Sequence, residues 1–328
     1  MAHVFVTRRI PQSALDRLQA EATVDVWPEP LPPPYEELRR RVADCEGLLC
    51  LLTDRIDADL IAAAPRLRVI SQMAVGYDNI DVAAATARGI PVGHTPGVLT
   101  ETTADLTWAL LLATARRLLD GVRSIEAGQW RTWDPLGLLG TDVHGATLGI
   151  VGLGRIGAAV ARRAVGFGMR VLYTGPREKP DVAAGVGATY VDFDTLLRES
   201  DIVSIHCPLT PETRHLFDAR AFARMKPGAL LINTARGGIV DHEALLEAVR
   251  SGHLGGAGLD VTEPEPLPAD HPLMHQERVI VTPHIGSATV RTRTRMANMA
   301  VDNLLAGLRG ERLPYCVNPE VYTKNGRG

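Results

Sequence analysis

The sequence has few cysteines, and none of them is spaced as a redox or metal motif requires. The 328 residues include four cysteines, Cys45, Cys50, Cys207 and Cys316, without any C-x-x-C pair. This pattern favours four reduced thiols in apolar surroundings. We also expect no metal in the functional site.

An excess of one charge and long hydrophobic runs are missing too. The formal net charge is -3 with 22% charged residues, so no basic excess points to nucleic acid or an anionic membrane. No apolar run is long enough and free enough of charge to span a bilayer. The first residues form a strand candidate at 3–6 in place of a signal-peptide pattern. We therefore expect a cytoplasmic globular protein of about two domains that binds neither nucleic acid nor membrane.

The most informative motif present is GLGRIG at 152–157, directly after the apolar run 147–151. In a G-x-G-x-x-G between a strand and a helix, the glycines permit a tight turn and let the backbone approach a dinucleotide pyrophosphate. Apolar residues then recur at helical spacing to 167, and 169–173 form the next strand candidate. This βαβ context favours a dinucleotide site over a glycine-rich turn without a ligand. Its mid-chain position predicts a second folding unit and a second ligand.

Strand and helix candidates alternate through the first hundred residues, which predicts a small parallel α/β sheet. The strand candidates are 4–6, 48–51, 69–71 and 90–92. One long helix is expected at about 102–119, with Thr100 as a possible cap, and another at about 289–308.

Three polar residues follow apolar strands of the second half: Arg236, Asp260 and His284. Ligands of open α/β sheets bind beyond the carboxyl ends of the strands, so these residues fall where chemistry is expected. Alone, Arg236 could be a solvated surface group, His284 a structural histidine and Glu265 an acidic loop residue. Beside a dinucleotide site they suggest an acid/base centre. An arginine can hold a carboxylate, a histidine can exchange a proton, and a glutamate can orient the histidine.

An ordered series of motifs closely resembles the D-isomer-specific 2-hydroxyacid dehydrogenases over nearly the full length. The motifs are AVGYD at 74–78, the glycine motif, CPLTPET at 207–213, NTARGG at 233–238, GLDV at 258–261, EPEP at 263–266 and PHIGS at 283–287. Three further segments resemble the glyoxylate/hydroxypyruvate reductase branch in particular: LCLLTD at 49–54, HIGSAT at 284–289 and NLLAGL at 303–308.

The resemblance implies an α/β fold with two doubly wound parallel-sheet domains. A Rossmann-type dinucleotide-binding domain, residues 101–288, would be inserted in a flavodoxin-like substrate-binding domain, residues 1–100 and 289–328. The catalytic cleft would lie between them. The resemblance also favours a homodimer in which Trp133 reaches the partner's substrate pocket, although Trp133 could instead anchor its own loop.

The resemblance also implies roles for individual residues. Arg236 would bind the substrate carboxylate and polarise the carbonyl, His284 would donate a proton to the carbonyl oxygen, and Glu265 would support the protonated histidine. Backbone amides of Val75 and Gly76 would hold the carboxylate from the other domain. The expected substrate site further includes Ser287 and Trp133. The expected cofactor contacts are Gly152, Gly154, Arg155, Ile156, Gly157, Thr174, Arg177, Lys179, Cys207, Pro208, Thr213, Thr234, Ala235, Arg236, Asp260, His284 and Gly286, with Asp260 on the nicotinamide amide.

The end of the second cofactor-domain strand predicts which dinucleotide is preferred. NAD enzymes of this fold usually place Asp or Glu there to bind the ribose 2′-OH. Here the strand ends at Thr174, and Arg177 and Lys179 follow. Thr174 can hydrogen-bond a 2′-phosphate and the two cations can neutralise it, unless they are only solvated loop charges. We predict NADP(H) as the preferred cofactor, with NAD(H) possible.

The sequence thus predicts a reversible reductase of glyoxylate or hydroxypyruvate, giving glycolate or D-glycerate. Another 2-oxo acid, such as 2-ketogluconate or pyruvate, is the alternative among enzymes. A nucleotide-sensing corepressor is the alternative from another class, but the sequence has neither a basic patch nor a disordered interaction tail to support it.

Overall fold

The computed structural model describes residues 1–324, and the chain divides into two compact units. The split unit holds Met1–Leu99 with Ala288–Gly328, and the central unit holds Thr100–Ser287. Residues 325–328, which belong to the expected second part of the substrate-binding domain, lie outside the described residues. Within 1–324, no helix combines the length and the apolar character that crossing a membrane requires.

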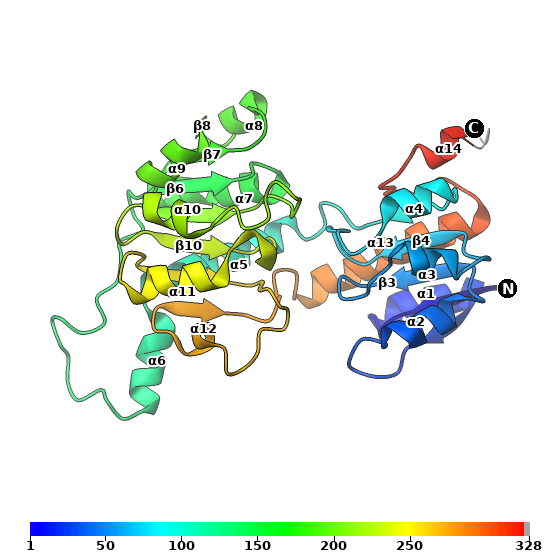
Figure 1. Ribbon diagram of the computed structural model, residues 1–328, viewed down its shortest axis with the longest axis horizontal. Helices are drawn as coiled ribbons and strands as arrows, with labels where there is room; N and C mark the ends of the chain where they lie inside the picture. The colour runs from blue at the N-terminus through cyan, green and yellow to red at the C-terminus, as the bar shows by residue number, and fades with distance from the viewer. Residues whose placement is uncertain (325–328) are drawn as a thin grey trace. The chain divides into compact units, whose positions relative to one another are not determined.

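The split unit is built on a five-stranded sheet in which every pair of neighbouring strands is parallel. In spatial order its strands are β2 (Ala22–Val26), β1 (Ala2–Val6), β3 (Gly47–Cys50), β4 (Val69–Gln72) and β5 (Val92–Gly93). Its helices, all labelled in Figure 1, are α1 (Gln12–Glu21), α2 (Tyr35–Val42), α3 (Ala58–Ala62), α4 (Val82–Ala87), α13 (Val290–Arg309) and α14 (Val321–Lys324). Four of the strands were predicted, and the edge strand β2 was missed.

The central unit is built on a seven-stranded parallel sheet. In spatial order its strands are β12 (Val279–Val281), β11 (Gly256–Leu259), β10 (Leu230–Asn233), β9 (Ile202–Ile205), β6 (Thr147–Val151), β7 (Arg170–Thr174) and β8 (Ala188–Tyr190). Its helices are α5 (Thr100–Ala115), α6 (Leu118–Glu126), α7 (Arg155–Ala164), α8 (Pro180–Ala184), α9 (Phe193–Glu199), α10 (Ala219–Arg224), α11 (His242–Arg250) and α12 (Pro272–His275).

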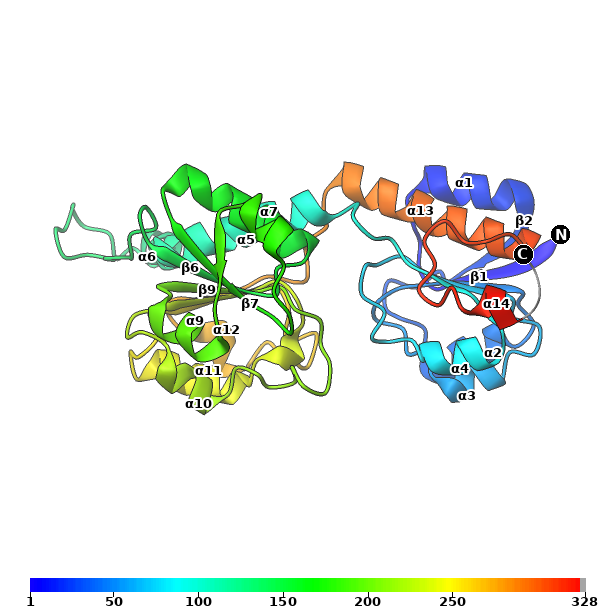
Figure 2. The same cartoon turned by 90° about the horizontal axis from the view of Figure 1, so that it is seen from above.

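Helices cover both faces of each sheet, as the continuous apolar strands require. In the split unit, Val4 and Val6 point to a core shared with α1 and α13, whereas Phe5 points to the opposite core shared with α2, α3 and α4. In the central unit, α5 and α7 lie on one face of the sheet, and α9, α10 and α11 lie on the other (Figure 2). The predicted fold class, two parallel-sheet α/β domains, is confirmed.

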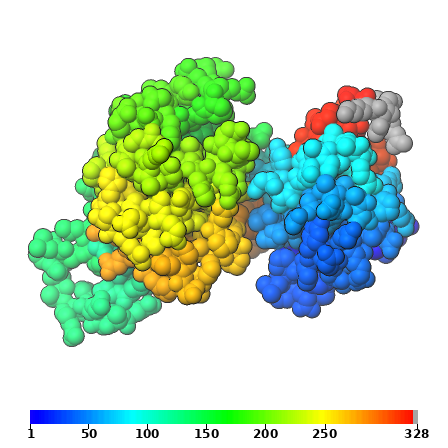
Figure 3. Space-filling view, viewed as in Figure 1, coloured from blue at the N-terminus to red at the C-terminus, as the bar shows by residue number. Residues whose placement is uncertain are grey.

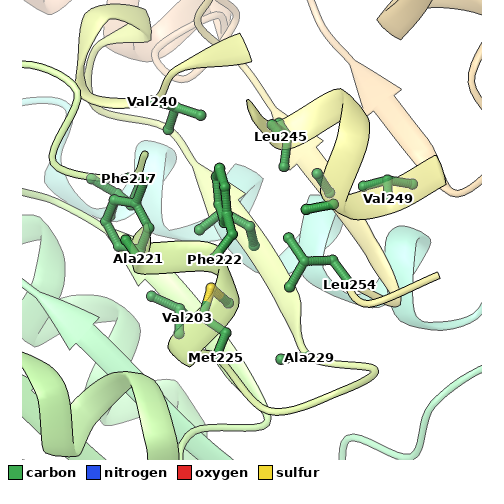
Figure 4. Packing of buried hydrophobic residues seen from close by; sticks show 14 of the residues in the cluster. Val203, Phe217, Ala221, Phe222, Met225, Ala229, Val240, Leu245, Val249 and Leu254 are labelled. Atoms are coloured by element: carbon green, nitrogen blue, oxygen red, sulfur yellow. The ribbon is translucent and has the colours of Figure 1, made fainter. Parts of the chain in front are cut away.

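The largest core cluster of the central unit lies under α10 and α11 (Figure 4). Phe217 and Phe222 are almost completely buried there, with ring centroids 6.2 Å apart. Met225 and Leu245 pack beside them. These contacts hold the helices against β9 and β10, two strands whose ends carry predicted site residues.

The prediction of one long helix at 102–119 is wrong, because two helices occupy that stretch. The first, α5, ends at Ala115, and the second, α6, begins at Leu118. Between them Arg117 adopts a left-handed backbone with φ of 51°, a conformation that stops an α-helix. The predicted last helix is α13, where the side chain of Thr289 accepts a hydrogen bond from the Thr292 amide and caps the helix.

Candidate active site

The glycine loop has the geometry that a dinucleotide pyrophosphate requires. Gly152 has φ of 98°, and a Cβ there would lie 2.8 Å from the Cys207 amide nitrogen. At Gly157 a Cβ would lie 2.3 Å from the Gly152 carbonyl oxygen, so this glycine lets α7 pack against the turn. A Cβ at Gly154 would meet nothing within 4 Å, so open space faces the backbone where α7 begins. The loop therefore fits a phosphate group at a helix N-terminus.

The end of β7 presents the hydroxyl of Thr174, and the loop after it carries two cations, Arg177 and Lys179, with the exposed Glu178 between them. Thr174 is buried at the last position of the strand, and its carbonyl accepts from the Gly152 amide at 2.9 Å. Lys179 turns back to the glycine loop, where its ammonium donates to the Leu153 carbonyl at 3.1 Å. Arg177 is exposed and forms no ion pair with the described residues. A positive charge thus lies against the loop that fits the pyrophosphate.

The other expected cofactor contacts border the same turn or lie at neighbouring strand ends. Arg155 and Ile156 form the first turn of α7. Cys207 lies beside Gly152, and burial raises the pKa of its thiol to about 11, so the sulfur stays protonated. Hydroxyls of the remaining two threonines are engaged within the protein: Thr213 donates to the Pro208 carbonyl at 2.7 Å, and Thr234 lies 2.9 Å from the Thr107 hydroxyl.

His284 and Glu265 form a close pair in the central unit. The His284 Nδ1 lies 2.6 Å from the Glu265 Oε1, and the two side chains are 25% and 34% exposed. Burial opposes ionisation of Glu265, but the hydrogen bond and charge of His284 outweigh it, so the pKa of Glu265 lies below its ordinary value. The carboxylate is therefore ionised at neutral pH, holds the Nδ1 proton and leaves Nε2 available.

Asp260 holds the backbone that carries His284. One of its carboxylate oxygens accepts from the Thr282 hydroxyl at 2.6 Å and the Ile285 amide at 2.8 Å, and the other accepts from the Gly286 amide at 2.7 Å. His284 itself has a left-handed backbone with φ of 54°, a conformation that costs a non-glycine residue about 1 kcal/mol or more. Burial raises the pKa of Asp260, and these hydrogen bonds oppose that rise. The expected contact of Asp260 with the nicotinamide amide stays a prediction.

Arg236 lies in the turn after β10, near the same pair. It is half-buried, and its Nη1 donates to the Ala235 carbonyl at 2.8 Å. The charge of Arg236 contributes to the lowered pKa of Glu265, so the Arg236 guanidinium stabilises the ionised form of that carboxylate. The structure thus pairs His284 with Glu265, places Arg236 where its charge acts on Glu265, and buries Ser287 in the turn after His284. Val75 and Gly76 belong to the split unit.

Asn233 also shapes this site and was not predicted from the sequence. Its side chain is fully buried, accepts from the Ala235 amide at 3.0 Å and donates to the Arg236 carbonyl at 2.9 Å. The Asn233 side chain therefore holds the backbone of the turn that carries Arg236. A signal was available, because asparagine often bonds to the backbone two residues further along the chain.

Trp133 stands in solvent within one chain. It is 80% exposed in the segment after α6, and Trp130 nearby is 69% exposed. Figure 3 shows this segment and α6 extending from the surface of the central unit. Such exposure disfavours the alternative that Trp133 anchors its own loop.

Comparison with known proteins places the chain in a family. Residues 108–286 match the family model described as "D-isomer specific 2-hydroxyacid dehydrogenase, NAD binding domain". The chain belongs to this family. It is therefore an NAD(P)-dependent oxidoreductase, as the motif series predicted, and the matched segment contains the glycine loop and the His284–Glu265 pair.

Full-length relatives agree with this assignment. The chain is 52% identical over 319 residues to a glyoxylate reductase of Korarchaeum cryptofilum, covering 97% of this chain and 96% of the relative. The crystal structure of the TT0316 protein from Thermus thermophilus has a TM-score of 0.90 and 52% identity, covering 96% of this chain and 99% of that chain. The crystal structure of a glyoxylate reductase from Paecilomyes thermophila has a TM-score of 0.86 and 34% identity, covering 96% and 98%.

Proposed function

We propose that this dehydrogenase is an NADPH-preferring reductase of short 2-oxo acids, with glyoxylate and hydroxypyruvate as substrates. The observation that carries the proposal is the 2.6 Å contact between His284 and Glu265 beside Arg236, at the strand ends of a dinucleotide-binding unit. Relatives named glyoxylate reductase, at 46–52% identity over nearly the whole chain, support the substrate class.

We assign the chemistry to three side chains and a pair of backbone amides. When bound, the reduced nicotinamide supplies the hydride that adds to the substrate carbonyl carbon. His284 gives the proton at Nε2 to the carbonyl oxygen, because Nδ1 is committed to Glu265. The ionised Glu265 balances the positive charge of the imidazolium before transfer. Arg236 binds the substrate carboxylate and polarises the carbonyl, and the amides of Val75 and Gly76 complete the carboxylate site.

We also propose roles for the two parts of the chain. Residues 101–288 would form the dinucleotide-binding domain, and residues 1–100 with 289–328 the substrate-binding domain. The two compact units, with boundaries at Leu99/Thr100 and Ser287/Ala288, support this division. The glycine loop in one unit and the Val75–Gly76 amides in the other support the assignment of roles.

The preference for NADPH rests on the end of β7. A ribose 2′-phosphate would meet the Thr174 hydroxyl and the charges of Arg177 and Lys179, and no carboxylate at the strand end would repel it. Replacing Lys179 by Met should raise KM for NADPH more than KM for NADH. Lys226→Met is the matched control, because the Lys226 ammonium pairs with Asp201 elsewhere. Equal effects of Lys179→Met on both cofactors would remove Lys179 from the 2′-phosphate site.

We propose a homodimer that covers the apolar face of α6 and the segment after it. Leu118, Val122 and Ile125 repeat at helical spacing on α6, and each is more than half exposed. A stripe of this kind normally packs against something, and a second copy of the chain is the occupant that the family resemblance favours. Sedimentation should give a dimer, and Val122→Asp should shift it to a monomer. Sedimentation of the wild type as a monomer would contradict the proposed homodimer.

The experiment that tests the function is a steady-state panel of four 2-oxo acids against both cofactors. Glyoxylate, hydroxypyruvate, 2-ketogluconate and pyruvate are each assayed with NADPH and NADH. We expect the highest kcat/KM for glyoxylate or hydroxypyruvate with NADPH. A higher value for 2-ketogluconate or pyruvate would overturn the substrate assignment, and an equal or higher value with NADH would overturn the cofactor preference. Tight dinucleotide binding without any turnover would favour a nucleotide-sensing protein.

A further inference from the structure

The loop after β4 has a run of carbonyl groups that the protein holds in place. Four consecutive carbonyl oxygens, of residues 74–77, each accept one hydrogen bond. The donors, in chain order of these carbonyls, are the Thr95 amide at 2.9 Å, His94 Nδ1 at 2.9 Å, Gln72 Nε2 at 3.2 Å and the Ile80 amide at 3.0 Å. In contrast, the amides of Val75 and Gly76 meet no acceptor anywhere in residues 1–324.

Because the peptide bond is planar, a hydrogen bond that holds a carbonyl group also fixes the direction of the N–H in the same peptide. In a trans peptide the C=O of one residue and the N–H of the next point in opposite directions. The only cis peptides within residues 1–324 lie elsewhere, at Pro264 and Pro266. The His94 bond to the Val75 carbonyl therefore sets the direction of the Gly76 N–H. The Gln72 bond to the Gly76 carbonyl sets the next N–H in the same way.

His94 is well placed to act as a fixed donor. A carbonyl oxygen can only accept, so Nδ1 carries the proton in this contact. The His94 backbone is held on both sides, because its carbonyl accepts from Asn303 Nδ2 at 2.9 Å and its amide donates to the Tyr315 carbonyl at 3.1 Å. Its ring also meets the Tyr77 ring edge-on, with centroids 5.6 Å apart.

Gln72 is fixed even more completely. It is fully buried, and its Nε2 donates to the Gly76 carbonyl and, at 2.7 Å, to Asn79 Oδ1. Its Oε1 accepts from the Cys50 thiol at 3.0 Å. Every hydrogen-bonding group of this amide except one lone pair is thus in use, and the side chain has one favoured orientation.

We infer that His94 is a positioning residue for the substrate carboxylate, acting through the Val75–Gly76 peptide, and that Gln72 supports the same loop. This inference rests on the proposed function, which assigns the carboxylate to the amides of Val75 and Gly76. Without the His94 donor the peptide can rotate, and the Gly76 N–H no longer points to one fixed place. The cofactor site lies in the central unit and does not depend on this donor.

The test compares His94→Leu with His94→Asn, two side chains of nearly the same shape. The Asn amide nitrogen is attached at the same place along the side chain as Nδ1 and can donate to the Val75 carbonyl, whereas Leu cannot. We expect His94→Leu to raise KM for glyoxylate about tenfold, as for the loss of one hydrogen bond to a charged group, and to leave KM for NADPH unchanged. His94→Asn should restore KM for glyoxylate to near the wild-type value.

A control variant, a replacement variant and a second readout complete the test. His3→Leu is the matched control, because the one hydrogen-bonding contact of the His3 ring among the described residues is with the Cys45 thiol of the same unit, at 3.7 Å. If His94→Leu fails to fold, His94→Ala serves as the donor-free variant. The second readout is the amide NMR signal of Gly76 on addition of oxalate, which should shift in the wild type and in His94→Asn and should shift much less in His94→Leu.

The two readouts separate this inference from the proposed function. A wild type that does not reduce glyoxylate, but whose Gly76 amide responds to oxalate in the His94-dependent manner, contradicts the function and supports the inference. A wild type that reduces glyoxylate, with the same KM and the same Gly76 response in His94→Leu, supports the function and overturns the inference.

Discussion

The glycine loop offers a substitution that should separate cofactor binding from folding. Gly154 has an extended backbone, with φ of -83° and ψ of -164°, which alanine adopts without strain. The added methyl would meet no atom within 4 Å and would project into the space assigned to the pyrophosphate. Gly154→Ala should therefore fold normally and bind the cofactor poorly.

The size of both effects follows from the geometry. Gly154 is the N-cap of α7, where alanine is a poorer residue than glycine, so the free energy of unfolding should fall by about 1 kcal/mol or less. Keeping the pyrophosphate away from the loop removes one or two charge-assisted hydrogen bonds, each worth roughly 1.5–3 kcal/mol. The total loss is roughly 1.5–6 kcal/mol, and 1.4 kcal/mol corresponds to about a tenfold change, so Kd for NADPH should rise by about 10- to 20,000-fold.

Calorimetric titration with NADPH and thermal unfolding of the free protein measure the two effects. Gly157→Ala is the comparison, because its Cβ would lie 2.3 Å from the Gly152 carbonyl oxygen and should destabilise the fold. A Gly154→Ala protein with normal stability and a Kd within twofold of the wild type would refute the reasoning. A loss of stability as large as that of Gly157→Ala would refute it as well.

Three other substitutions test neighbouring parts of the account. Glu265→Gln should lower kcat by roughly 10- to 100-fold with an unchanged Kd for NADPH, since only the charge beside His284 is lost. Because the folded pKa of Glu265 is lowered, its stabilising effect is present above the ordinary carboxyl pKa of ~4.3 and is lost as pH falls through the folded value. Any difference in Tm between wild type and Glu265→Gln should thus disappear in acid, and a difference that persists there would contradict the pair. Asp260→Asn should lower the free energy of unfolding in urea by roughly 1–3 kcal/mol, because an NH₂ group would face donors inside the protein. An unchanged free energy of unfolding would contradict the role of Asp260 in holding the His284 backbone. Phe222→Ala should cost about 3–5 kcal/mol in the same assay, and a loss below 1 kcal/mol would mean that the core of Figure 4 collapses around the gap.

The fold class and the family could be predicted because their signals are local. The glycine motif, its preceding strand and its following helix all lie within residues 147–164, and each fits the others. Polar residues after β10, β11 and β12 could be located because parallel strands share one carboxyl edge. The sequence could therefore place Arg236, Asp260 and His284 at that edge of the sheet.

The parts that could not be predicted depend on backbone conformation or on distant contacts. No glycine or proline marks the break at Arg117, and the apolar spacing of α5 continues into α6. Strand β2 has only one fully buried residue, Ala22, so its apolar signal is weak. The donor that fixes the Val75–Gly76 peptide comes from His94, and the donor that fixes the next peptide comes from Gln72. The link from His94 to Asn303 spans 209 residues. Such contacts exist only in the folded chain.

The role of His284 as proton donor is the central claim, and one measurement tests it most directly. It is kcat for glyoxylate reduction at saturating NADPH, in the wild type and in His284→Ala. We expect turnover by the wild type and a fall in kcat of roughly 100- to 10,000-fold in the variant. Near-normal turnover by His284→Ala would contradict the account.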